Sequence, residues 1–493
     1  MPATRAACWR MSGWTKIWHE ILTTQSGLVG LTGGGILPDA KMTLCSAVSG
    51  HPTKLRTFLP FHAGKMSASI HDQKPQHVSI SPLLKRLAYP ATERRVEASE
   101  IASAFALIFE DGISHIQTAA LLTLLHSTGL DRDAEVIAKC SHRMREAARQ
   151  VDRPTLKAAI KSRGKKEGNY RGGLCDIVGT GGDMHSTFNI STTSSIIASP
   201  LLMTAKHGNR AQTSFSGSAD VLNAITPVPP KIGAVNAENL PQVYAETNYS
   251  FLFAPNFHFG MMYADPVRRG LGLRTIFNLM GPLANPVDWA IEARVVGVAY
   301  QSLGPVFVEA LRQNGCKKAL VVCGEEDLDE ISCAGKTNCW QLTEYPNPAY
   351  QGSQEDECSC DEEEHPRTLV KMEMFQLHPS DFGLPTHPLS DVGGRKMPKD
   401  NAAKLMSILR NELPRDDPIL SFVLMNVAAL LTVSGICDAD TSNMGPGDDG
   451  QVITERGPGG GRWKEGVRRA RWAVESGAAL KSFEHFIEVT NRL

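Results

Sequence analysis

The chain has 493 residues, which by size alone corresponds to about two to three domains with a sizeable hydrophobic core. Hydrophobic residues make up 42% and charged residues 21%, the composition of an ordinary globular protein. The formal net charge of −1 argues against a main role in binding nucleic-acid phosphates, because domains with that role are usually strongly basic. We therefore expect no nucleic-acid partner.

The 11 cysteines are scattered and never spaced C-x-x-C. This pattern fits reduced thiols of the cytoplasm better than a disulfide framework or a zinc site. Cys358 and Cys360 form the nearest approach to a pair, but no second pair of ligands lies nearby, so a solvated loop is the favoured interpretation.

The N-terminal residues, 1–77, are predicted to be a poorly ordered extension outside the fold. Glu20 and Asp39 are the only acids among the first 65 residues, which resembles a transit segment, although no clear amphipathic basic helix is present. Alternatively, the natural protein begins at Met66, and this interpretation is favoured.

Residues 78–160 have a helical pattern. Ser81-Pro82 predicts a helix start, Ser114 with Gln117 predicts a capping box, and Asp131 is the predicted start of a further helix through Met144. We expect a small all-helical domain that serves packing or subunit contact, with a contribution from a helical segment near 255–275.

Residues 172–493 alternate between strand-like and helix-like segments, which predicts an α/β domain with a mostly parallel central sheet flanked by helices. The predicted strands are Cys175–Val178, Leu201–Ala205, Ser250–Ala254, Ala293–Ala299 and Ala319–Val322. Segments near 346–368 and 438–462, the first acidic and the second rich in glycine, are predicted to be mobile insertions. The uncharged run Pro418–Cys437 is interpreted as a buried core helix and not as a membrane span, so no membrane partner is expected.

The most informative stretch is the glycine-rich turn Gly179-Thr180-Gly181-Gly182-Asp183, which lies between a strand and a helix start near Asn189. Glycines let the backbone approach a ligand closely, and the amide groups of a helix start attract anions. The turn lacks the lysine of the Walker loop and is not G-x-G-x-x-G, so neither a nucleoside triphosphate nor a dinucleotide is indicated. Lys206 and Arg210 follow within one strand-and-helix unit, which predicts a phosphorylated substrate.

Several ordered blocks make the sequence resemble the anthranilate phosphoribosyltransferase family of tryptophan biosynthesis. The resemblance extends from about Val78 to the C-terminus. The matching blocks are Gly179–Asp183, Thr187–Thr192, Lys206–Arg210, Ser216–Ser218, Phe253–Pro255 with His258, Arg274–Asn278 with Gly281–Leu283, and Asp329–Ser332.

The family transfers the phosphoribosyl group of phosphoribosyl pyrophosphate to the amino group of anthranilate and releases pyrophosphate. By resemblance, the donor would be bound by Gly179, Gly182, Asp183, Thr187, Asn189, Ile190, Ser191, Thr192, Lys206, Gly208, Asn209, Arg210, Ser214 and Ser218. Hard oxygen ligands and a pyrophosphate leaving group select Mg²⁺. The resemblance implies two Mg²⁺ ions, one at Ser191 and one at Asp329 and Glu330, although these carboxylates could also belong to an exposed acidic loop.

The resemblance also implies an acceptor site. Arg268 matches the arginine that receives the anthranilate carboxylate, while Gly179, His207, Asn209 and His258 would line the aromatic site. The aromatic amine is neutral near pH 7, so no strong general base is expected, and catalysis would come from orientation and from electrostatic stabilisation by Lys206 and Arg268.

Three residues depart from the family pattern. Phe259 and Met262 stand where the family usually has proline and lysine, and Asp265 lies in a run that is usually uncharged. We expect these changes to affect the affinity for anthranilate more than the class of reaction.

Two alternatives remain open from the sequence. A pyrimidine nucleoside phosphorylase shares this fold, but its lysine motif continues with serines and glycines, whereas Lys206 precedes His-Gly-Asn-Arg. A non-catalytic, nucleic-acid-binding relative is disfavoured by the net charge and by the Asp329-Glu330 pair. We expect a cytoplasmic homodimer that pairs through the helical domain.

Overall fold

The computed structural model describes residues 77–89, 95–211, 216–350, 367–394 and 397–493. These residues belong to one compact unit, Asp72–Leu493. The predicted N-terminal extension, apart from residue 77, most of the acidic insertion and Ser214 lie outside the described residues.

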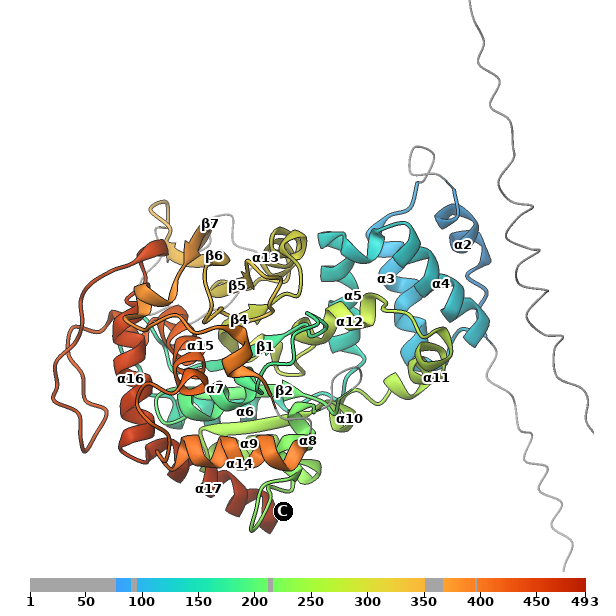
Figure 1. Ribbon diagram of the computed structural model, residues 1–493. Coiled ribbons are helices and arrows are strands. Elements are labelled where there is room, and N and C mark those ends of the chain that lie inside the picture. The colour runs from blue at the N-terminus through green and yellow to red at the C-terminus, as the bar shows by residue number, and fades with distance from the viewer. Residues whose placement is uncertain (1–76, 90–94, 212–215, 351–366, 395–396) are drawn as a thin grey trace, which may run out of the picture. The chain divides into compact units, whose positions relative to one another are not determined.

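A small helical domain precedes the α/β domain in the chain (Figure 1). Its elements are α2 (Ser81–Leu87), α3 (Ala98–Ala106), η1 (Leu107–Glu110), α4 (His115–Ser127), η2 (Leu130–Arg132) and α5 (Ala134–Glu146). Two later helices, α11 (Met261–Leu271) and α12 (Ile276–Met280), contribute Ala264, Val267 and Phe277 to the same hydrophobic core. A segment distant in sequence therefore completes this domain.

The helix starts follow local capping. Ser114 accepts a hydrogen bond from the Gln117 N–H at 3.3 Å, as the sequence predicts for α4. The predicted start of the next helix at Asp131 is wrong. Asp133 is the N-cap because its carboxylate accepts from the N–H groups of Glu135 and Val136, both at 3.0 Å, whereas Asp131 lies buried beside His126.

The described part of the α/β domain contains a seven-stranded sheet in the order β3-β2-β1-β4-β5-β6-β7. The strands are β1 (Leu174–Gly179), β2 (Met203–Gly208), β3 (Tyr249–Phe253), β4 (Ile291–Gly297), β5 (Ala319–Gly324), β6 (Thr337–Pro346) and β7 (Thr368–Leu377). Neighbours among β1–β5 are parallel, while β5, β6 and β7 pair antiparallel. The predicted fold class is confirmed, and β6 and β7 are additions that the sequence did not predict.

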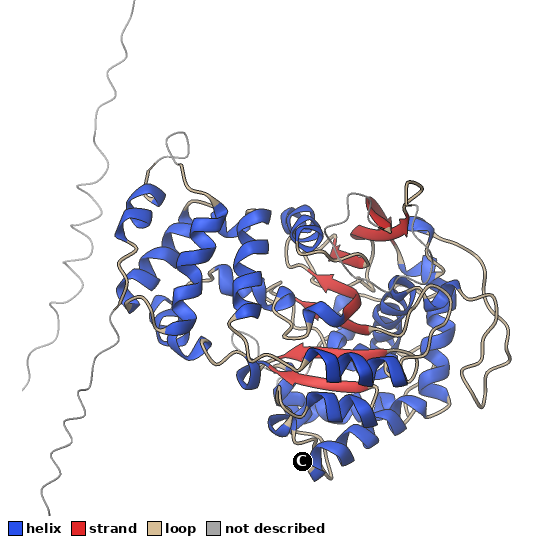
Figure 2. Ribbon diagram, turned by 180° about the vertical axis from the view of Figure 1, so that it is seen from behind, coloured by secondary structure: helices blue, strands red, loops and turns tan. Residues whose placement is uncertain are grey.

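Helices cover both faces of the parallel strands (Figure 2). On β5, Leu320 and Val322 pack into the core that contains α7 (Ile190–Ala198), α15 (Pro418–Ser434) and α16 (Trp463–Glu475). The intervening Val321 and Cys323 pack on the opposite face, against α13 (Gly304–Gln313). Because successive side chains of these strands point into two different apolar layers, the strand sequences are continuous apolar runs.

The remaining elements surround these layers. They are α6 (Arg153–Arg163), α8 (Ser218–Asn223), η3 (Ile232–Ala234), α9 (Leu240–Glu246), α10 (Ala254–Phe257), η4 (Gly281–Leu283), η5 (Asp288–Ala290), η6 (Gln301–Leu303), η7 (Pro379–Phe382), η8 (Leu389–Val392), α14 (Pro398–Leu409), η9 (Ile436–Asp438), η10 (Pro458–Gly460) and α17 (Ala478–Arg492). Helix α15 is buried along most of its length, as expected of a core helix. Among the described helices, none combines the length and apolar character needed to cross a membrane.

The glycine-rich segment 438–462, which the sequence predicts to be mobile, is hydrogen-bonded to α16 at several points. The Trp472 indole N–H donates to the Pro446 carbonyl at 3.1 Å, and the Ile453 N–H donates to Glu465 Oε2 at 2.9 Å. Arg468 forms an ion pair with Asp448 at 2.9 Å. The anchors come from α16, so local composition alone could not indicate them.

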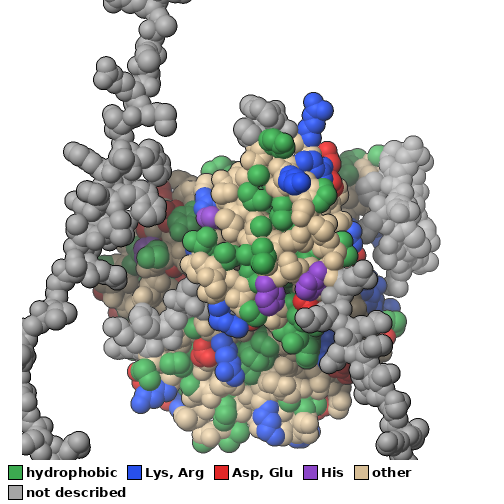
Figure 3. Space-filling model, turned by 90° about the vertical axis from the view of Figure 1, so that its right-hand side faces the viewer, with side chains coloured by type: hydrophobic (Ala, Val, Ile, Leu, Met, Phe, Trp, Pro, Cys, Tyr) green, Lys and Arg blue, Asp and Glu red, His purple; other side chains and the backbone are tan. Residues whose placement is uncertain are grey.

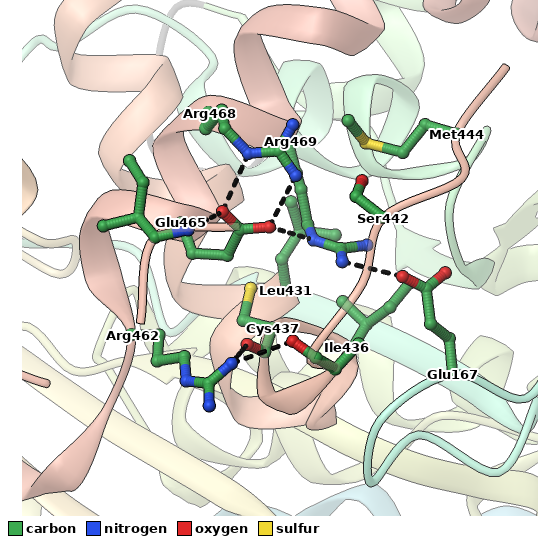
Figure 4. Close-up of polar contacts among 12 residues, drawn as sticks. Glu167, Leu431, Ile436, Cys437, Ser442, Met444, Arg462, Glu465, Arg468 and Arg469 are labelled. Atoms are coloured by element: carbon green, nitrogen blue, oxygen red, sulfur yellow. Dashed lines mark hydrogen bonds and ion pairs between the residues drawn. The ribbon is translucent and has the colours of Figure 1, made fainter. Parts of the chain in front are cut away.

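A buried polar cluster joins this segment to the core (Figure 4). The Glu465 and Arg469 side chains are both inaccessible to solvent and pair at 2.7 Å. Arg469 also pairs with Glu167 at 2.7 Å, and Arg462 donates to the Ala439 carbonyl at 2.8 Å. The cluster thus connects the segment before β1, the region after α15 and helix α16.

Candidate active site

A cleft of about 600 Å³ lies at the carboxyl ends of β1 and β2 and is closed on its other side by α10, α11 and α12. Strand β1 lies between β2 and β4. From β1 the chain continues to β2 and β3 on one side of it, and it later returns to form β4 on the other side. Ligands of open α/β sheets bind at such a switch point, outside the carboxyl ends of the strands. The glycine-rich turn directly follows β1 and forms part of the cleft wall.

The glycine-rich turn requires its glycines. Gly181 and Gly182 have φ of +66° and +80°, a region that favours glycine. A Cβ on Gly182 would stand 1.8 Å from Arg274 Nη1. The Gly181 N–H donates to Asp329 Oδ2 at 2.6 Å, and Arg274 Nη2 donates to the Gly181 carbonyl at 3.1 Å. Two remote segments therefore fix the backbone of the turn.

The start of α7 lies beside this turn. Asn189 is its N-cap residue and donates from Nδ2 to the Ser216 carbonyl at 3.2 Å, while Ser191 and Thr192 line the cleft. Thr187 instead forms a β-bridge with Gly393. The first turn of α7 thus brings hydroxyl groups and the positive end of the helix dipole to the cleft, an arrangement that suits an anion.

Lys206 on β2 is the most deeply buried cation of the cleft, with 3% of the residue exposed. Burial lowers its pKa, an effect that Asp176, Glu330 and Asp329 oppose. Burial likewise raises the pKa of Asp176, which also accepts a hydrogen bond from Asn285 at 3.0 Å. The ammonium group therefore faces carboxylates on one side and the cleft on the other.

Asp329 and Glu330 form the acidic wall of the cleft. Desolvation raises the pKa of both carboxyl groups, and the neighbouring carboxylates add to the rise. The buried oxygen Oε2 of Glu330 has no hydrogen-bond partner. A divalent cation would relieve this repulsion and satisfy that oxygen, so the residues fit Mg²⁺. Within the described residues, no group of three or more His, Cys, Asp or Glu side chains is placed to hold a metal ion.

Two histidines form the wall between β2 and α10. The rings of His207 and His258 lie 5.2 Å apart, centroid to centroid, and His258 Nε2 is 2.9 Å from the Ala284 carbonyl oxygen. Burial lowers the pKa of His258 to about 4 and places the pKa of His207 well below its usual value. Both rings are therefore neutral near pH 7 and present an uncharged surface.

Arg268 lines the cleft from α11, which packs in the core of the helical domain, whereas the acidic wall follows β5 of the α/β domain. Its side chain is 15% exposed and pairs with Asp265 at 3.5 Å. The guanidinium carbon lies 5.3 Å from the centre of the Phe277 ring. Phe259 and Met262, both more than half exposed, also line the cleft. These residues combine a cation with aromatic and aliphatic surface, as an aromatic carboxylate requires.

The structure brings most of the predicted site residues together. Those that line the cleft are Gly179, Asn189, Ser191, Thr192, Lys206, His207, Gly208, Asn209, Arg210, Ser218, His258, Arg268, Asp329 and Glu330. Gly182, Asp183, Thr187 and Ile190 are absent from this lining: Ile190 packs into the core and Asp183 accepts from the His185 N–H at 3.1 Å. Ser214 lies outside the described residues.

Other residues of the cleft received no role from the sequence. Arg274 belongs to a matching block and contacts the glycine-rich turn, and Asn278, from the same block, lines the cleft. Met144 reaches the cleft from α5. An arginine beside a glycine-rich turn could have been suspected from its block, whereas no sequence signal connects α5 to the site.

Comparisons with known proteins agree with this geometry. Residues 171–480 match the glycosyl transferase family, a/b domain, and residues 81–148 match the helical bundle domain of the glycosyl transferase family. The chain is 38% identical over 318 residues to the anthranilate phosphoribosyltransferase of Schizosaccharomyces pombe, which covers 64% of this chain and 75% of the relative.

Solved structures of anthranilate phosphoribosyltransferase from Saccharomyces cerevisiae are also similar. The one in complex with PRPP and Mg superposes with a TM-score of 0.64 at 29% identity, covering 83% of this chain and 97% of that one. The one in complex with 4-fluoroanthranilate has a TM-score of 0.62 at 28% identity, with the same coverage. The fold, the cleft and these similarities agree: the chain belongs to the anthranilate phosphoribosyltransferase family.

Proposed function

We propose that this cleft is where the chain carries out the reaction of its family, transfer of the phosphoribosyl group from phosphoribosyl pyrophosphate to the amino group of anthranilate. The observation that carries the proposal is the set of residues that the two domains bring to the cleft wall. The α/β domain contributes the glycine-rich turn, Lys206 and the acidic wall, and α11, which packs in the core of the helical domain, contributes Arg268. One substrate is a multiply charged phosphate ester, and the other is an aromatic carboxylate.

The donor would occupy the end formed by β1, β2 and α7. Ser191, Thr192 and the amide groups at the start of α7 would bind its phosphates, and Lys206 would add a fixed positive charge. Gly182, Asp183, Thr187 and Ile190, which do not line the cleft, would act through the shape of the turn and the helix start. The yeast complex with PRPP and Mg supports a donor site in this fold.

Mg²⁺ would be held by Ser191 in one position and by Asp329 and Glu330 in a second, each completed by oxygen atoms of the donor. When bound, the ions supply positive charge that neutralises the departing pyrophosphate. The chain contributes the acidic wall, in which the buried Glu330 Oε2 has no hydrogen-bond partner and could bind a cation. We propose two ions.

Anthranilate would lie between the two histidines and Arg268, with its carboxylate on the guanidinium group. Its amine is neutral near pH 7 and can form the bond to the ribose carbon as the bond to pyrophosphate breaks, after which the nitrogen loses a proton. His207 and His258 are neutral and packed together, so their role is to shape the aromatic site. Orientation and electrostatic stabilisation account for the rate in this mechanism.

The proposed activity has a direct assay. Purified protein is mixed with Mg²⁺, phosphoribosyl pyrophosphate and anthranilate, and the loss of anthranilate fluorescence is followed. We expect turnover that requires all three components. Absence of turnover by correctly folded protein would reject the proposal.

Arg268→Ala is expected to raise the KM for anthranilate about 30-fold, or ~2 kcal/mol, because a charge-assisted contact to the carboxylate is lost. The KM for the phosphoribosyl donor should change little. The neighbouring Arg269 is exposed and does not line the cleft, so Arg269→Ala is the matched control. Equal increases in KM for both substrates would count against the assignment of Arg268.

The double variant Asp329→Asn, Glu330→Gln should flatten the dependence of the rate on Mg²⁺ concentration, because the hard anionic ligands are lost. The measurement is initial rate against Mg²⁺ at saturating substrates. Glu325→Gln, at an exposed acid of the same loop, should leave the profile unchanged. An unaltered profile in the double variant would remove Asp329 and Glu330 from the metal site.

We also propose a cytoplasmic homodimer that pairs through the helical domain. Hydrophobic side chains are spread over the face that this domain presents (Figure 3), and on α4 Ile116 is 82% exposed. All cysteines that the structure describes are free thiols, which suits a reducing compartment. Sedimentation of Ile116→Glu beside the unaltered chain tests the dimer contact, and an unchanged dimer would locate the contact elsewhere.

A further inference from the structure

Asp265 and Arg268 lie one turn apart on α11, and both line the cleft. Their side chains point toward each other, with 3.5 Å between Asp265 Oδ1 and Arg268 Nη1. Arg268 is the residue to which we assign the acceptor carboxylate. An intramolecular carboxylate therefore already stands beside the guanidinium group that the substrate must reach.

We propose that Asp265 is a specificity-determining residue that competes with the acceptor carboxylate for Arg268. The inference rests on the proposed function. When no acceptor is bound, Asp265 partly neutralises Arg268. Anthranilate must displace it, and Asp265 thereby weakens the binding of carboxylate-bearing acceptors.

The exposures of the two side chains support an exchange of partners. Arg268 is 15% exposed and is held over the Phe277 ring, so its guanidinium group stays in place. Asp265 is 39% exposed, so its carboxylate can turn toward water at little cost. The 3.5 Å separation is longer than a good charge-assisted hydrogen bond of about 2.7–2.9 Å. A planar substrate carboxylate with both oxygens on the guanidinium group is the better partner.

The surrounding charges favour the same exchange. Arg274 is a further cation that lines the cleft, and Arg149 lies over the Phe259 ring at 4.1 Å. Asp265 is the acid on α11. Its charge opposes that of the incoming carboxylate, and a partly exposed ion pair with this separation is weak, so its loss changes an affinity by no more than about fivefold. The expected effect on acceptor affinity is therefore modest but measurable.

The test is the kinetics of Asp265→Asn, which keeps the shape of the side chain and removes its charge. We expect the KM for anthranilate to fall about three- to fivefold, the fold-change of an exposed ion pair. The KM for the phosphoribosyl donor should stay within a factor of about two. Methyl anthranilate, which keeps the amine and lacks the negative charge, should show no change of KM between the variant and the unaltered chain.

Two further variants are controls. Glu110→Gln removes one negative charge from an exposed position of η1, which packs against α11, and should leave both KM values unchanged. Asp265→Glu retains the charge and should not lower the KM for anthranilate.

Each outcome is decisive. No turnover by the unaltered chain would reject the proposed function. Turnover with an unchanged or increased KM for anthranilate in Asp265→Asn would overturn the role of Asp265. An equal fall in KM for anthranilate and for methyl anthranilate would also overturn it, because the effect would then be independent of the substrate carboxylate.

Discussion

Lys206→Met should lower kcat/KM for phosphoribosyl pyrophosphate by roughly 100- to 1,000-fold, or ~3–4 kcal/mol, the usual loss when one preorganised electrostatic contact to a developing charge is removed. The ammonium group is buried beside the acidic wall and faces the cleft. In such surroundings a charge acts on the leaving pyrophosphate with little screening by water. Steady-state kinetics with the donor varied at saturating anthranilate and Mg²⁺ is the measurement.

The variant must also remain folded. Methionine conserves most of the volume, and Asp176, whose pKa burial already raises, can protonate while keeping its hydrogen bond from Asn285. Lys231→Met changes an exposed lysine that does not line the cleft and is the control. A folded Lys206→Met protein within fivefold of the unaltered kcat/KM would contradict the assigned role.

Glu465→Ala is expected to destabilise the α/β domain by about 3–5 kcal/mol, because it leaves the Arg469 charge buried with one carboxylate fewer. Glu465 accepts from Arg468 and Arg469 and from the Ile453 N–H, so the variant loses contacts on α16 and on the segment before it (Figure 4). Urea unfolding followed by tryptophan fluorescence measures the change. The reporter Trp463 is buried close by.

Two further variants distinguish the loss of a partner for a buried charge from other causes of destabilisation. Glu455→Ala breaks an exposed ion pair with Lys464 and should cost about 0–1 kcal/mol. The double variant Glu465→Leu, Arg469→Met removes the fully buried pair, leaves Glu167 and Arg468 nearer to solvent, and should recover part of the lost stability. If Glu465→Ala lost no more stability than Glu455→Ala, the cluster would have no structural importance.

The sequence predicted the parallel part of the sheet because β1–β5 are buried on both faces and read as apolar runs. It did not predict β7, because Lys371 and Glu373 alternate with half-exposed residues on an edge strand. Charged edge strands avoid pairing with other chains and carry a weak hydrophobic signal. Composition did not reveal the hydrogen bonds of segment 438–462 for a different reason, because their partners on α16 are tertiary contacts.

In the candidate site, too, the features set by local sequence could be predicted and those set by tertiary packing could not. The glycine-rich turn and Lys206 could be assigned to phosphate binding because their local sequence determines strand, turn and helix start. Arg274 and Met144 reach the cleft through packing between the two domains, which short-range spacing does not encode. The spacing of Asp265 and Arg268 places them on one face of a helix, but their importance depends on where α11 lies against the cleft.

We propose that both substrates occupy this one cleft, with the amine of anthranilate facing the ribose of the phosphoribosyl donor. A crystal structure of the chain with phosphoribosyl pyrophosphate, Mg²⁺ and 4-fluoroanthranilate tests it most directly. We expect phosphates between the glycine-rich turn, the start of α7 and Lys206, and the aromatic carboxylate on Arg268. An aromatic acid bound away from Arg268, or a donor away from the turn, would contradict it.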